Sequence, residues 1–159
     1  GVILDGEICA GRNIGGNELG HMVIVEDGET CTCGRHGCLE AYVSVRALVR
    51  DAERVTGQEM TPEEIFAQAE AGNAELKELI RRYTGRLGTG LVNVVNIFRP
   101  QLVLLGGELS AQMEPLLPSL QRMLKEGCFG GADSEYPDIK IAALGNDAGV
   151  IGAASLKSL

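Results

Sequence analysis

The spacing of apolar residues along the chain predicts strands that alternate with helices. Residues 2–4 and 8 are apolar on either side of an Asp5–Gly6 turn, which is typical of a β-hairpin. Residues 21–28 form a second apolar run that ends at another Asp-Gly turn, so we expect a short strand there. The intervening residues 10–20 are polar and rich in glycine, and they are predicted to form a loop.

Three helices are predicted in the middle of the chain, at residues 39–56, 61–72 and 74–98. The second opens with the sequence TPEE, which is a capping box with proline at the first helical position. The second half of the third helix is apolar on most sides, so we expect it to be buried centrally. Three glycines in this half predict either close packing or a break: Gly85, Gly88 and Gly90.

The last third of the chain repeats the alternation. The run LVLLGG at 102–107 predicts a fully buried strand that delivers a glycine pair at its carboxyl end. A helix at 110–127, a strand at 138–144 and a final helix capped by Asn146 or Asp147 follow. Strands followed by helices indicate an α/β fold. Because no repeat or linker interrupts the pattern, residues 1–159 are interpreted as a single domain.

Composition and charge narrow the classes of function. The formal net charge of −8 disfavours a nucleic-acid surface, which needs clustered Lys and Arg. No apolar run approaches the roughly 20 residues of a membrane span, and the first residues lack the features of a signal peptide. The chain begins in strand-like sequence without Met, so we expect a fragment of a longer protein. An odd count of five cysteines favours a reducing, cytoplasmic location over a secreted disulfide framework.

Three of the cysteines, Cys31, Cys33 and Cys38, lie within eight residues with the spacing C-x-C-x4-C. Three thiolates in one loop can reach a single tetrahedral zinc ion, and Gly34 and Gly37 permit the tight turns that this requires. The alternative is three free or partly paired thiols. A disulfide between the first two is unfavourable because they are too close in sequence. The spacing therefore predicts a zinc site.

The fourth ligand is ambiguous from spacing alone. His36 lies inside the cysteine loop, whereas His21 precedes it by ten residues, and we favour His21 because it would tie the loop to the preceding segment. Such a tie would also bring Glu40 near Glu18. Two carboxylates and an imidazole suit a polyhydroxyl ligand, because carboxylates accept hydrogen bonds from vicinal hydroxyl groups. Equally, Glu40 is explained by a favourable charge at the start of a helix.

Gly106 and Gly107 follow the predicted buried strand at the point where a helix is expected to begin. A Gly-Gly turn there lets a ligand approach the backbone closely, and nucleotides often bind at such a position. No G-K-[ST] follows, so this is not a P-loop. A simple tight turn is the default interpretation.

Together these motifs resemble the ROK family (repressors, open reading frames and sugar kinases), near its bacterial glucokinase branch. The resemblance rests on GNELGHMVI, on CTCGRHGCLEAY, and on VLLGGELS followed by NDAGVIGAA, and it covers essentially the whole chain. It implies the carboxyl-terminal half of an actin-like, ribonuclease H-like ATPase fold with a zinc-binding loop. It further implies the following residues: His21, Cys31, Cys33 and Cys38 for structural zinc; Glu18, His21 and Glu40 for a sugar; Gly106 and Gly107 for the adenosine side of a nucleotide.

The resemblance also implies what this chain lacks. Kinases of the family carry a phosphate loop and a catalytic Asp in an amino-terminal domain, and neither motif occurs here, so no residue of this chain is assigned as catalytic. We expect the parent to be an ATP-dependent hexose kinase, using Mg-ATP and glucose or a related hexose, and the chain alone to be inactive. The alternatives are the sugar-sensing domain of a ROK repressor and a plain zinc-containing interaction domain. A dimer or tetramer is the usual assembly implied.

Overall fold

A computed structural model describes residues 1–9, 11, 16–130 and 134–155 of the chain. Part of the predicted 10–20 loop and the end of the predicted last helix lie outside these residues. None of the described helices is long and apolar enough to cross a bilayer. The elements are, in order, β1 (Ile3–Leu4), β2 (Glu7–Ile8), η1 (Leu19–His21), α1 (Glu40–Val43), α2 (Val45–Thr56), α3 (Pro62–Glu70), α4 (Ala74–Phe98), β3 (Leu102–Leu105), η2 (Ser110–Gln112), η3 (Glu114–Leu116), α5 (Leu117–Gly127), β4 (Asp138–Ile141), η4 (Gly145–Asp147) and α6 (Ala148–Ser155).

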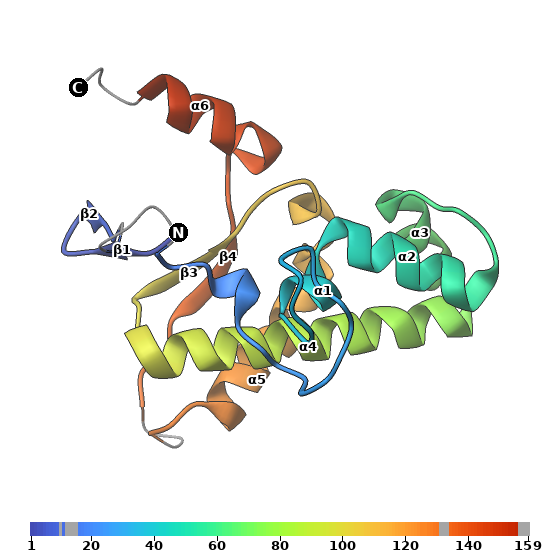
Figure 1. Ribbon diagram of the computed structural model, residues 1–159, viewed down its shortest axis with the longest axis horizontal. Helices are drawn as coiled ribbons and strands as arrows, with labels where there is room; N and C mark the ends of the chain where they lie inside the picture. Colours follow the sequence, from blue (N-terminus) through green and yellow to red (C-terminus); the bar gives the residue numbers. More distant parts are fainter. Residues whose placement is uncertain (10, 12–15, 131–133, 156–159) are drawn as a thin grey trace.

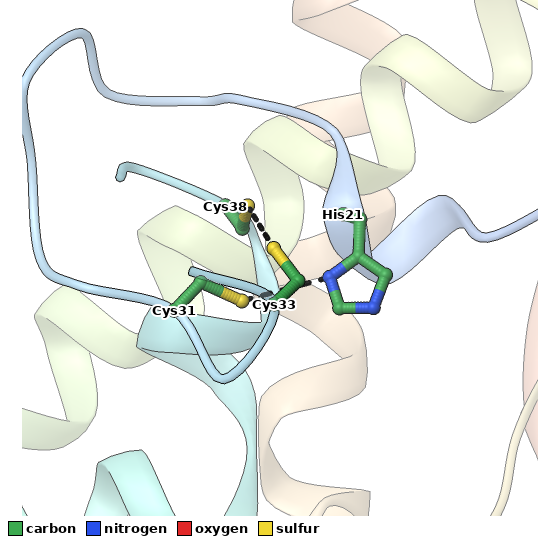
Figure 2. A group of neighbouring side chains, drawn as sticks. All are labelled: His21, Cys31, Cys33 and Cys38. Carbon is green, nitrogen blue, oxygen red and sulfur yellow. Dashed lines mark hydrogen bonds between the residues drawn. The ribbon is translucent and has the colours of Figure 1, made fainter. Parts of the chain in front are cut away.

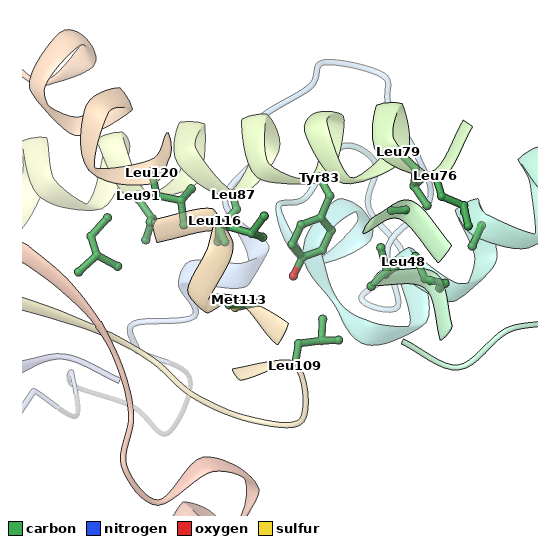
Figure 3. Packing of buried hydrophobic residues seen from close by; sticks show 14 of the residues in the cluster. Leu48, Leu76, Leu79, Tyr83, Leu87, Leu91, Leu109, Met113, Leu116 and Leu120 are labelled. Carbon is green, nitrogen blue, oxygen red and sulfur yellow. The ribbon is translucent and has the colours of Figure 1, made fainter. Parts of the chain in front are cut away.

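Helix α4 is the element against which helices α1, α2, α3 and α5 pack (Figure 1). Its bounds are those predicted, because the Asn73 side chain caps its first amides and Arg99, in the left-handed region, ends it before Pro100. One stripe along it is buried against α1, α2, α3 and α5 (Figure 3). The members of the stripe recur three or four residues apart: Leu76, Leu79, Tyr83, Leu87, Leu91 and Val95.

Two of the three α4 glycines, Gly88 and Gly90, pack closely against neighbouring side chains, and none of the three breaks the helix. A Cβ on Gly88 would lie 2.4 Å from the Met123 sulfur of α5, and one on Gly90 would lie 2.5 Å from Leu39. Gly85 has no such neighbour within 4 Å. Central burial of this half was predicted too broadly, since Ile97 near its end is 66% exposed. Gly88 and Gly90 therefore set how closely α5 and the start of α1 approach α4.

Two small sheets account for the strands of the described residues. The predicted hairpin is confirmed: β1 and β2 pair antiparallel, and Asp5 and Gly6 both have positive φ, as the turn requires. Strands β3 and β4 pair with each other in parallel, and α5 lies between them in the sequence. The prediction of full burial for β3 was wrong, because Leu102 and Leu104 are 43% and 58% exposed. Only alternate residues of β3 pack on the helices. The strand is therefore covered on one face and exposed on the other.

Three local predictions were also wrong in detail. Residues 21–28 form no strand; the 3-10 turn η1 and an isolated bridge between Val23 and Cys38 replace it, because this segment bends around the cysteine loop. The helix predicted at 39–56 is divided at Ser44, whose extended backbone and side chain cap α2. Likewise the segment 110–127 begins with two 3-10 turns before α5. The capping box at the start of α3 is present as predicted.

Backbone hydrogen bonds between distant residues shape the cysteine loop. The amide of Leu39 donates to Met22 at 2.8 Å, and that of Ile24 donates to Gly37 at 2.9 Å. Gly37 has φ +77°, and a Cβ there would lie 1.7 Å from the carbonyl oxygen of Val25. Gly34 also has positive φ, but open space surrounds its Cα. Thus Gly37 is required by both conformation and space, and Gly34 by conformation alone.

Replacing Gly37 by Ala is therefore expected to open the loop, whereas Gly34→Ala should cost only the roughly 1–2 kcal/mol of a left-handed non-glycine residue. Hydrogen exchange at the Ile24 amide measures the difference, because its acceptor is the Gly37 carbonyl. We expect exchange at Ile24 to accelerate strongly in G37A and little in G34A. Equal protection in the two variants would contradict this account of the loop.

Candidate metal centre and ligand site

The structure brings His21 together with the three loop cysteines (Figure 2). One ligand atom from each of these four residues lies within 4.8 Å of all the others. His21 ends η1, while Cys38 lies at the junction with α1 and is fully buried. The backbone pairing of residues 22–25 with 37–39 holds the two ends of the site side by side.

The distances within the cluster fit a tetrahedral zinc ion. Two sulfurs bound to one zinc at about 2.3 Å would lie about 3.8 Å apart, and a sulfur and an imidazole nitrogen about 3.6 Å apart. The Sγ atoms of Cys33 and Cys38 are 3.7 Å apart, and Cys31 Sγ is 3.5 Å from His21 Nδ1. Three thiols and an imidazole are also the donor set that zinc prefers. The residues present therefore fit this metal.

The two neighbouring thiols differ in acidity. Hydrogen bonds from the backbone and the guanidinium group of Arg35 lower the pKa of Cys33 to about 6. Desolvation raises the pKa of Cys38 to about 11. Cys33 is therefore the more acidic of the two thiols, and a binding cation would have to displace a proton from Cys38.

His21 presents its two nitrogens to different partners. Nδ1 faces Cys31, while Nε2 lies 4.0 Å from Oε2 of Glu40 in the first turn of α1. Gly20 packs against this carboxylate, since a Cβ there would lie 3.8 Å from Oε2. The side chains of His21 and Glu40 are 25% and 36% exposed, so both reach the surface. The His21 imidazole thus has one nitrogen toward a cysteine sulfur and the other toward the partly exposed Glu40 carboxylate.

Glu18 and His36, the other two candidate residues near the cysteine loop, lie apart from the contacts among His21, the cysteines and Glu40. Glu18 precedes η1, and its carbonyl oxygen accepts a hydrogen bond from the His21 amide at 3.0 Å. Its carboxylate is exposed and has no hydrogen-bond or ion-pair partner among the described residues. His36 is exposed and turns away from the sulfurs, with Nδ1 3.4 Å from the Thr30 hydroxyl and 3.3 Å from the Gly28 carbonyl.

A separate ionic network anchors the loop to α2. The Glu29 carboxylate accepts hydrogen bonds from Arg54 at 2.8 and 3.3 Å, and Arg50 lies 3.8 Å away. The bond from Arg54 lowers the pKa of Glu29. A pocket of about 290 Å³ lies beside this anchor, and Tyr42 and Tyr83 are among its lining residues. Neither Glu40 nor His21 lines it, so it is distinct from the candidate ligand site.

Gly106 and Gly107 form a tight turn at the carboxyl end of β3. Gly107 has φ +91°, and its carbonyl oxygen accepts hydrogen bonds from the amide and hydroxyl of Ser110. A Cβ on Gly145 would lie 3.7 Å from the same hydroxyl. The glycine turn therefore lies beside the segment that leads into α6, which places two of the sequence motifs together.

Sequence reasoning missed two residues of the cysteine loop. Thr32 donates a hydrogen bond to Oε1 of Glu40 at 2.5 Å, and Arg35 donates one to the His21 carbonyl oxygen at 2.9 Å. Both occupy x positions of the C-x-C-x4-C pattern, where residue type and spacing carry no signal of contact. Only the path of the folded loop reveals them.

Comparison with known proteins places this arrangement in a family. The chain is 29% identical to a glucokinase of Halalkalibacterium halodurans, with 96% of this chain and 50% of that protein covered. It is 28% identical to the DNA-binding transcriptional repressor Mlc of Escherichia coli, covering 99% of this chain and 41% of the repressor. The crystal structure of a ROK family glucokinase from Streptomyces griseus in complex with glucose and AMPPNP superposes with a TM-score of 0.86 at 28% identity, over 96% of this chain and 54% of that one.

The chain thus spans about half the length of the curated relatives it matches. Its α/β fold is that of the matching part of ROK sugar kinases, which have an actin-like ATPase fold. The model of the ROK family matches residues 1–158, so this chain belongs to the ROK family.

Proposed function

We propose that this chain is the sugar-binding, zinc-containing, carboxyl-terminal domain of an ATP-dependent hexose kinase, with glucose as the substrate. The observation that carries the proposal is the placement of His21 between a cysteine sulfur, 3.5 Å from Nδ1, and the Glu40 carboxylate, 4.0 Å from Nε2. One side of the imidazole suits a metal and the other suits a polar ligand.

We infer that His21, Cys31, Cys33 and Cys38 hold the metal. Zinc with three thiolates and an imidazole has its four ligands, so it would supply rigidity and no open position for Lewis-acid chemistry. Ligation through Nδ1 requires the proton of a neutral His21 to lie on Nε2, which is then a donor toward the solvent-facing side.

In the proposed sugar site, His21 Nε2–H donates a hydrogen bond to a ring hydroxyl, while the carboxylates of Glu40 and Glu18 accept hydrogen bonds from hydroxyl groups. The backbone bonds of the loop hold His21 and Glu40 before the ligand arrives. Such preorganisation matters because a misplacement of about 1 Å can cost on the order of a hundredfold in rate. These residues bind and orient the sugar and take no part in proton transfer.

The chemical step requires groups that we assign to the remainder of the parent. An Asp there would deprotonate the primary hydroxyl of the sugar, whose oxygen would attack the γ-phosphorus of Mg-ATP as the bond to the β–γ bridging oxygen breaks and ADP leaves. On this chain, Gly106 and Gly107 would lie against the nucleotide, consistent with the tight turn after β3. We propose that the parent assembles as a dimer or tetramer in the cytoplasm.

A second function is the sugar-sensing domain of a ROK repressor. The specific observation in its favour is the match to Mlc over 99% of this chain, at nearly the same identity as the glucokinase match. The same sugar and zinc residues would serve either protein. Glucose-dependent ATP turnover by the full-length parent would support the kinase, whereas sugar-dependent DNA binding without turnover would support the repressor.

For the metal, elemental analysis of the purified chain should find about one zinc per chain. His21→Ala should lose both zinc and monosaccharide affinity, because one side chain serves both. His36→Ala is the matched control from the same loop and should lose neither, since its ring turns away from the sulfurs. A stably folded chain free of zinc would contradict the assignment of these four residues as zinc ligands.

For the ligand, calorimetric titration of the zinc-loaded chain with glucose should show binding. Glu40→Gln should weaken it, because the amide nitrogen that replaces one carboxylate oxygen cannot accept a hydrogen bond from a hydroxyl group. The same preparation should show no glucose-dependent ATP hydrolysis or phosphoryl transfer. Measurable phosphorylation by this chain alone would overturn the assignment of the catalytic base to another part of the parent.

A further inference from the structure

We propose that Thr32 is a positioning residue for the sugar-binding carboxylate, acting through Oε1 of Glu40. The inference rests on the proposed function, because it concerns the same ligand site. Thr32 stands between the cysteines Cys31 and Cys33, on the cysteine loop rather than on α1. Its hydroxyl donates to Glu40 Oε1 at 2.5 Å, which joins the loop directly to the first turn of α1.

Thr32 is the closer of the two side-chain donors to Oε1 among the described residues. Its hydroxyl lies 2.5 Å from Oε1, whereas Cys31 Sγ lies 3.8 Å away, and a thiol is a weak hydrogen-bond donor. The Thr32 hydroxyl is therefore the group that holds Oε1 in place.

The same bond determines which carboxylate oxygen is available to a ligand. Oε1 is directed to Thr32, so Oε2 is the oxygen that faces His21 Nε2 at 4.0 Å. Hydroxyl groups of a sugar would then meet an imidazole donor and a carboxylate acceptor side by side. Without Thr32, partial rotation of the Glu40 carboxyl group would withdraw the acceptor oxygen from its place beside His21, and ligand binding would have to restore that orientation.

The backbone that carries Thr32 is well placed to do this. The amide of Cys31 donates to the Arg35 carbonyl at 2.8 Å, and the amide of Gly34 donates to the Cys31 carbonyl at 3.0 Å. A threonine also has few side-chain rotamers, since its Cβ is branched. The hydroxyl is thus presented from a short, hydrogen-bonded turn whose flanking residues are the candidate metal ligands.

The first test compares three variants of the zinc-loaded chain. Thr32→Val keeps the shape and removes the donor, Thr32→Ser keeps the donor, and Thr30→Val is the matched control because the exposed Thr30 hydroxyl faces His36. All should retain zinc by elemental analysis. T32V should bind glucose roughly tenfold more weakly, the order expected for a hydrogen bond to a charged group, with T32S and T30V near the unaltered chain. Unchanged affinity in T32V, or equal losses in T32V and T32S, would overturn the proposal.

A second measurement does not depend on sugar binding. Side-chain ¹³C relaxation of Glu40 in the zinc-loaded chain should report a restricted carboxyl-bearing side chain that becomes mobile in T32V and is restricted again in T32S. Equal mobility in all three would refute the positioning role. If the unaltered chain binds no monosaccharide while Glu40 behaves as expected, the proposed function fails and the role of Thr32 in ordering Glu40 stands.

Discussion

The backbone pairing of residues 22–25 with residues 37–39 is the interaction on which the candidate site depends. It brings the end of η1 against the start of α1, although the two are separated by the whole cysteine loop. The pairing passes through Gly37, where any side chain would collide with the Val25 carbonyl oxygen. The candidate metal ligands and the candidate sugar-binding residues from both ends of the loop meet as a consequence.

This arrangement joins a polar, functional loop to a rigid scaffold. Helix α4 supplies the scaffold, since its buried stripe contacts α1, α2, α3 and α5. Gly90 lets Leu39 lie directly on α4, so α1 and therefore Glu40 are positioned by the core. At the far side of the loop, the Glu29–Arg54 pair holds the chain to α2. The site is thus supported at both ends, whereas its ligand-facing side remains open to solvent.

Much of the fold could be predicted because it follows local rules. The bounds of α4, the capping box of α3 and the β1–β2 turn each depend on residues within a few positions of one another. Two of the errors arose where contacts between residues far apart in the chain decide the structure. Residues 21–28 have strand-like composition, yet the loop that they enclose bends them, and β3 is apolar throughout although only one of its faces packs.

For the site, the sequence by itself determined which residues could ligate a metal, because C-x-C-x4-C with an upstream histidine is a pattern of residue types at fixed spacing. It left open which histidine approaches the sulfurs and whether Glu40 does more than favour the start of a helix. Only the tertiary structure decided that His21 lies between Cys31 and Glu40, and that Thr32 contacts the same carboxylate. The physical reason is that the direction of a side chain depends on backbone hydrogen bonds between segments far apart in the chain, which spacing does not encode.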